Sequence, residues 1–355
     1  MDPSHLIPFP DPIPVPWVWV EFLLLLTFVI HLLFMNTMIG TGIIAFVYHI
    51  RRPRAISPLT EDISKMIPYA IAFTVNMGVA PLLFLQVLYG HFIYVSSVLM
   101  AVYWISIIVL LILAYYSAYI YDFRYEALGS FRLFFIGLSV AIFLLIGFFI
   151  TNNMTLMIKP EAWGAYFGPD HGRILNLSDP TLWPRYLHFM TASVALGGLF
   201  IAMMPRLKRP RDLKDRDDRI TLGMRWFSYA TLAQIAIGLW FLMALPPHLK
   251  MRFMGGDFFY SGVFVVGIAG AVVSLIFGFK QRVVPAAISV IGTIILMVII
   301  RDLVRWGYLN RYFTPSSLKL IHQYSPFILF VCSLVIVLVV IGYMLRLASR
   351  IGKGV

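Results

Sequence analysis

Nine apolar runs of about 20 residues, separated by short polar connections, constrain this chain more than any other feature. A helix needs about 20 apolar residues to cross the ~30 Å hydrocarbon core of a bilayer. Hydrophobic residues make up 60% of the chain and charged residues only 12%, whereas soluble domains have about half and a quarter. We therefore expect an all-α membrane protein with nine transmembrane helices. The predicted spans are 17–50, 67–90, 98–121, 132–157, 184–204, 224–246, 257–279, 283–304 and 321–347.

The positions of lysine and arginine predict how the bundle lies in the membrane. With the N-terminus outside, 19 of the 28 Lys and Arg residues fall in or beside the inner connections. Such an excess is typical of the cytoplasmic side, so we expect the C-terminus in the cytoplasm. Residues 1–16 are predicted to be an extended periplasmic lead-in, 17–347 a single transmembrane domain and 348–355 a cytoplasmic tail. We therefore interpret the net charge of +12 as basic residues that orient the helices in the lipid bilayer. No nucleic acid partner is expected.

The eight histidines carry the first functional signal. Two of them, His31 and His188, lie inside apolar spans, where an ionisable residue is costly and usually functional. Either each imidazole bonds to a neighbouring helix, or it ligates haem iron, for which neutral imidazole and apolar helix walls are well suited. The residues expected at the outer interface, with either role open, are His91, His248 and His322. The residues expected to be solvated are His5, His49 and His171.

The detailed runs around these histidines resemble subunit I of the cytochrome bd quinol oxidases. In span 1, FVIHLLFMNTMIGTG is similar to the family's first-helix motif, and its haem-ligating histidine corresponds to His31. In span 2, FTVNMGVAPLLFLQVLYG follows the family's N-x-x-M-G-V-A run. DPTLWPRYLHFMTASVALGG resembles the segment that carries the low-spin haem b ligand, which corresponds to His188. The resemblance covers essentially the whole chain and implies the same nine-helix bundle and orientation.

The chain departs from the family where oxygen chemistry takes place. Gln86 replaces a glutamate of span 2, and the family's paired glutamates have no counterpart in span 3, which contains no acid before Asp122. The family's methionine ligand falls on Val265, and 257–279 contains no methionine. An apolar helix cannot relay protons to a buried oxygen site, so we do not expect the oxygen reduction of the bd enzymes. His188 is also expected to have a different axial partner.

The quinol-binding regions of the family are also altered. The long loop after span 6 is reduced to PPHLKMRFMGG, leaving His248, Lys250 and Arg252. In span 8, Asp302 stands where the family has a haem-ligating glutamate, with Arg301 and Arg305 beside it. These three residues either anchor the helix end as an ion-pair cluster or bind haem propionates or a quinol, since arginine pairs well with carboxylates and aspartate can accept a proton.

We therefore expect one or two b-type haems near the outer face, ligated by residues among His31, His188, His322, His91 and His248. The expected pairs are His188 with His322 or His248, and His31 with His91. Six-coordinate haem transfers electrons without binding oxygen. The expected function is electron transfer between the quinone pool and a periplasmic c-type cytochrome, within a respiratory complex of the bacterial or archaeal inner membrane that contains other membrane subunits. A divergent oxidase subunit that still reduces oxygen and a haem-free scaffold subunit are the alternatives.

Overall fold

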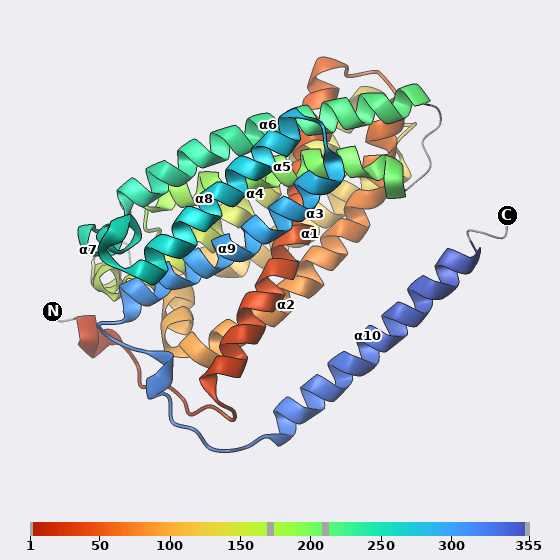
Figure 1. The fold of residues 1–355 in the computed structure, drawn as a ribbon. Coiled ribbons are helices and arrows are strands. Elements are labelled where there is room, and N and C mark those ends of the chain that lie inside the picture. The colour runs from red at the N-terminus through yellow and green to blue at the C-terminus, as the bar shows by residue number, and fades with distance from the viewer. Residues whose placement is uncertain (1–2, 169–173, 208–212, 352–355) are drawn as a thin grey trace.

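The fold is a bundle of long apolar helices (Figure 1). The computed structural model describes residues 3–168, 174–207 and 213–351, and in these ranges nine helices are long and apolar enough to cross a membrane. This confirms the all-α class and the number of spans. The nine are α1 (Trp17–Arg51), α2 (Pro58–Met100), α3 (Val102–Phe123), α4 (Arg132–Met157), α5 (Leu182–Leu207), α6 (Leu213–Ala244), α8 (Phe258–Phe279), α9 (Val283–Leu309) and α10 (Ser325–Ile351).

The predicted spans match these helices closely except in α2, which begins before 67 and ends after 90, at Met100, and in α6, which begins before 224. Pro58 occupies the first turn of α2, a position where its missing N–H is not needed. The polar first turns are held together because Arg219 of α6 bonds to Asp62 of α2, with 2.8 Å between Nη1 and Oδ2. Both helices therefore extend beyond the apolar layer. At its other end α2 stops at Ala101, where a φ of 39° separates it from α3.

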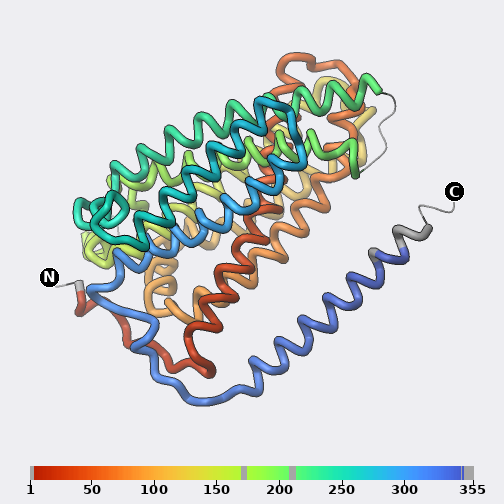
Figure 2. Tube along the Cα trace, in the orientation of Figure 1, coloured from red at the N-terminus to blue at the C-terminus, as the bar shows by residue number. Residues whose placement is uncertain are grey.

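The bundle has two ends, and we call the one where α1 begins the N-side. Here a short helical turn at Pro3–Leu6 is followed by residues 7–16, which are largely extended. The lead-in is fixed to the segment before α10, since Ile13 donates its N–H to Lys319 O at 2.8 Å and accepts one from Ile321 at 3.0 Å. Figure 2 shows the two segments side by side at this end.

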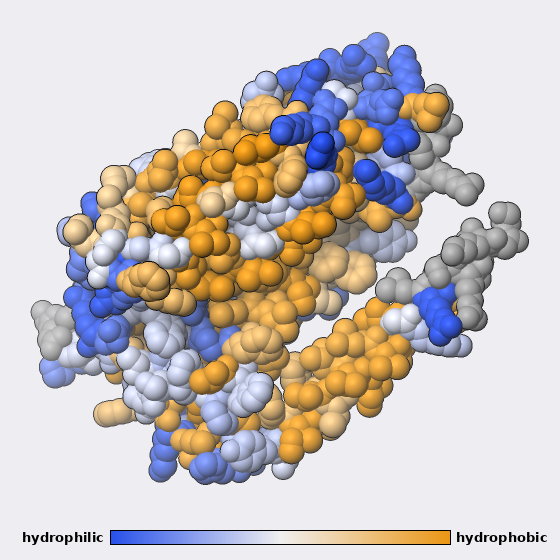
Figure 3. All heavy atoms as spheres, in the orientation of Figure 1, coloured by the Kyte–Doolittle hydropathy of each residue, from blue (hydrophilic) through white to orange (hydrophobic). Residues whose placement is uncertain are grey.

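Helix α10 lies apart from the rest of the bundle. None of its apolar window is buried, and Figure 3 shows it separated from the other helices over most of its length. Its first turns touch the bundle through two ring contacts, Trp19 with Phe327 and Phe84 with Phe330. Residues 348–351 of the expected tail continue α10, and 352–355 lie outside the described residues. The broad apolar surface in Figure 3 indicates a lipid environment.

Helix α5 lies at the centre, and its position is set by contact with α1. A side chain at Gly40 would place its Cβ 1.8 Å from the carbonyl oxygen of Ser193 and 2.9 Å from Cα of Gly197. Only glycine allows the two backbones to lie this close, as in membrane bundles generally. One turn away, the Ser193 hydroxyl donates to Asn36 Oδ1 at 2.7 Å. This contact fixes the helix that carries His188.

Candidate functional site

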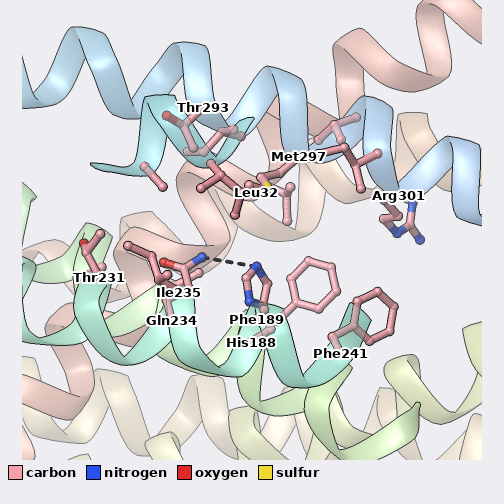
Figure 4. Close-up of a pocket in the computed structure, with 18 of the residues that line it drawn as sticks. Leu32, His188, Phe189, Thr231, Gln234, Ile235, Phe241, Thr293, Met297 and Arg301 are labelled. Carbon is pink, nitrogen blue, oxygen red and sulfur yellow. Dashed lines mark hydrogen bonds between the residues drawn. The ribbon is translucent and has the colours of Figure 1, made fainter. Parts of the chain in front are cut away.

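A cavity of about 190 Å³, partly open to the surroundings, lies between α1, α5, α6, α8 and α9. Its wall along α9 extends from Val290 to Val304, about 21 Å at 1.5 Å per residue. Most of the lining is apolar, and Figure 4 shows several of its polar residues, among them His188, Gln234 and Arg301. Apolar clefts with a few placed polar groups are the usual sites of cofactors.

His188 projects from α5 into this cavity. Its Nδ1 is buried without a hydrogen-bond partner, and Gln234 donates to its Nε2 over 3.4 Å, which is long for a hydrogen bond. The ring has space because Gly238 faces it, where a Cβ would lie 3.2 Å from Cε1. The imidazole thus lacks the firm partners expected of a purely structural buried histidine.

Two arginines line the cavity near its N-side end. The guanidinium of Arg185 lies 5.2 Å from the ring centre of Phe241, and its Nε and Nη2 are buried without hydrogen-bond partners. Arg301 reaches the cavity from α9, with its guanidinium 4.3 Å from the ring centre of Phe28. Aromatic faces attract these cations but do not neutralise them. The cavity end is therefore suited to a ligand that carries carboxylates.

Met297 supplies the cavity's soft sulfur donor. It lies on α9, and Figure 4 shows it entering from the wall opposite His188. Its methyl group lies near Gly267 of α8, where a Cβ would be 3.4 Å away. We did not single it out from the sequence, because the family comparison places the methionine ligand in the preceding span. A search for every possible haem ligand in the apolar spans would have included Met297, because thioethers ligate haem iron.

The group expected to act together faces two directions, the cavity and Glu21. Its members are Arg301, Asp302 and Arg305. Arg301 lines the cavity, whereas Nη2 of Arg305 donates both to Asp302 and to Oε1 of Glu21, the latter at 2.9 Å. The guanidinium of Arg305 also lies 4.5 Å from the ring centre of Tyr89. Glu21 was absent from the predicted site, although an acid within an apolar span is itself a functional signal.

His31 forms a separate site between α1 and α2. Its Nδ1 lies 3.1 Å from the carbonyl oxygen of Thr74, so the ring N–H donates there and leaves Nε2 free. This is how ligating histidines are commonly oriented. Gly78 makes room for the ring, because a Cβ there would lie 2.9 Å from Cε1. His31 is not among the residues that line the cavity of His188.

The expected histidine pairs are not brought together within the described residues. His91 lies 13 residues beyond Gly78 on α2, about 20 Å along the axis, and packs between Phe92 and Phe313. His248 is exposed in a short helix, α7 (Pro247–Met251), and does not line the cavity.

His322 was expected in the first turn of the last span, and this was wrong. It precedes α10 with a φ of 50° and is exposed, 3.3 Å from the hydroxyl of Tyr324. The lead-in pairs with residues 319–323 as extended backbone, so the helix begins later, at Ser325.

His49 is another correction. It was expected to be solvated, but it is fully buried, and its Nε2 lies 2.9 Å from the Tyr121 hydroxyl. The last turns of α1 pack against α2 and α3 instead of entering solvent, because α2 begins early. His5 is exposed as predicted, and His171 lies outside the described residues.

Asp179 positions the start of α5. Its carboxylate is buried and accepts hydrogen bonds from the N–H and hydroxyl of Thr181, both at 2.7 Å, and from Lys159, whose Nζ lies 2.6 Å away. Burial raises the pKa of Asp179, but these bonds to Lys159 and Thr181 outweigh it and hold the pKa below its usual value. The turn before Arg185 and His188 is thereby fixed.

No protein-family model, curated protein or solved structure matches this chain. Among the described residues, no three His, Cys, Asp or Glu side chains gather where they could hold a metal ion. Function is therefore inferred from the cavity and from the single residues that line it.

Proposed function

We propose that this chain is a haem b subunit of a respiratory complex, transferring electrons between the quinone pool and a redox protein on the N-side. The observation that carries the proposal is His188, whose ring lacks a firm partner and faces an apolar cavity beside two arginines. Three features of one cavity thus suit the iron, the porphyrin and the two carboxylates of haem.

The residues present fit this group. Haem iron takes four ligands from its porphyrin and needs only axial ligands from the protein. His188 and Met297 would ligate the iron, while Arg185 and Arg301 would bind the propionates. When bound, haem b supplies reversible one-electron transfer. His31, with Nε2 free and Gly78 beside its ring, is the candidate ligand for a second haem.

The chain's own residues favour electron transfer over oxygen reduction. His188 and Met297 lie on opposite walls of the cavity and would both hold the iron, and haem with two protein ligands transfers electrons without binding oxygen. The apolar part of α3 has no acid to deliver protons. These features support an electron-transfer subunit more strongly than a divergent oxidase subunit.

The surroundings of the cavity support a place in a larger assembly. Of the three residues expected to bind haem propionates or a quinol, Arg301 is the one that lines the cavity, whereas Asp302 and Arg305 bond to each other. The surface of α10 is free to pack against other membrane subunits. We place the N-side in the periplasm of a bacterial or archaeal inner membrane, where a c-type cytochrome would be the partner. A haem-free scaffold subunit is the second candidate function, because the exposed face of α10 would also suit a subunit that only anchors others.

Haem analysis of the purified protein tests this proposal. We expect a pyridine haemochrome spectrum of haem b, which His188→Ala reduces by one haem per chain. His248→Ala is the matched control, since His248 is exposed and away from the cavity, and it should leave the content unchanged. Absence of haem b in the wild-type protein would refute the proposal and favour the scaffold. A haem d band with oxygen uptake would favour the oxidase.

A further inference from the structure

Glu21 is a buried acid that the proposed electron path does not use. It is 6% exposed, its Oε1 accepts from Arg305 at 2.9 Å, and its Oε2 has no hydrogen-bond partner. Asp302 binds the same nitrogen, Nη2 of Arg305, so one guanidinium nitrogen serves two carboxyl groups. Burial of a carboxyl oxygen without a donor disfavours the ionised form of its group, so one proton shared by this trio is expected on Glu21.

The charges around Glu21 lead to the same conclusion. Helix α9 contributes Asp302, Arg305 and the more distant Arg301, and α2 contributes the Tyr89 hydroxyl. Arg305 alone bonds to both acids, so the bonded trio carries a net charge of −1 when all three groups are ionised. An uncompensated charge costs several kcal/mol at low dielectric. One proton makes the trio neutral, and Glu21 is its natural site because Oε2 lacks a donor.

Glu21 lies between the cavity and the N-side. It is four residues from the start of α1, about 6 Å along the axis, and seven residues, about 10 Å, from Phe28 of the cavity wall. On α9, Arg305 follows Val304, which also lines the cavity. A change of charge in the cavity therefore acts on Glu21 through a short path of low dielectric, with little screening by salt.

We propose that Glu21 is the proton acceptor coupled to electron transfer in this cavity. The positive charge of an oxidised carrier in the cavity would keep Glu21 ionised. When a quinol supplies one electron, that charge is neutralised, and the Glu21 carboxylate takes one proton from N-side water and becomes the acid. When the electron leaves, the O–H bond breaks and the proton returns to the N-side. This inference rests on the proposed function for its electron carrier, whereas the shared proton rests on the geometry of the trio.

Redox titration at several pH values tests the coupling. The wild-type midpoint potential should fall as pH rises, by up to about 59 mV per pH unit for one electron and one proton. Glu21→Gln should remove most of this slope. Glu126→Gln, in an exposed loop, is the control and should retain it. A flat wild-type profile, or an unchanged slope in Glu21→Gln, would overturn the coupling.

Infrared spectroscopy tests the proton itself without any cofactor. At neutral pH the reduced wild-type protein, or the cofactor-free protein if it lacks haem, should show a carboxylic acid carbonyl band that shifts in D₂O. The band should vanish in Glu21→Gln and persist in Glu126→Gln. Its persistence in Glu21→Gln would refute the protonation of Glu21. A haem-free protein that keeps the Glu21 band would refute the proposed function and the coupling but not the shared proton.

Discussion

Replacing Gly40 with alanine tests the helix contact that positions His188. The new Cβ would lie 1.8 Å from the carbonyl oxygen of Ser193, and ordinary contacts begin near 3.4 Å, so α1 and α5 must separate by about 1.6 Å. That shift also breaks the 2.7 Å hydrogen bond from Ser193 to Asn36. Overpacking costs about 1–3 kcal/mol and the lost bond about 1 more. We expect a loss of about 2–4 kcal/mol in the free energy of unfolding.

Denaturant unfolding in detergent micelles, followed by circular dichroism, measures this change. Gly292→Ala is the matched control, because nothing lies within 4 Å of the new Cβ in the middle of α9. It should leave the stability unchanged or raise it by up to about 1 kcal/mol, since alanine is the better helix former. If Gly40→Ala were as stable as Gly292→Ala, the close packing of α1 and α5 would be refuted.

Three further predictions concern single side chains. Gly238→Val crowds the His188 ring, 3.2 Å from the Cβ position, and should weaken haem binding at least tenfold in a haem titration; unchanged binding would contradict the site. Arg305→Met leaves the buried acids without a cation and should cost about 3–5 kcal/mol of unfolding free energy, whereas Glu21→Gln should cost under about 2; equal losses would contradict the shared proton. Because the pKa of Asp179 is held below its usual value, its stabilisation is present above pH about 4 and lost as the pH falls through the folded-state pKa. The stability difference between wild type and Asp179→Asn should therefore narrow from pH 6 to pH 3 in thermal unfolding, and a constant difference would argue against this role.

The number of helices could be predicted from the sequence because each span needs about 20 apolar residues. Their ends were less predictable where a tertiary contact decides them. α6 begins at Leu213 instead of 224 because Arg219 pairs with Asp62, and α10 begins after residues 319–323 because these pair with the lead-in. Apolar length alone contains no information about such pairings.

The candidate site was predictable only in part. His188 and Arg301 were singled out as polar residues in apolar spans, and both line the cavity. Met297 was missed, because a methionine in an apolar helix has no polarity to mark it and its place in the cavity wall depends on packing. Glu21 carried the same polar signal as His188, but its importance depends on Arg305, 284 residues away in sequence.

The optical spectrum of the purified wild-type chain, recorded with His188→Ala and Met297→Leu, tests the central claim most directly. We expect a low-spin, six-coordinate haem b signal that His188→Ala removes. Met297→Leu should open one axial position, giving a high-spin haem that binds carbon monoxide. A wild-type chain without haem b, or a haem signal unchanged by His188→Ala, would contradict the account.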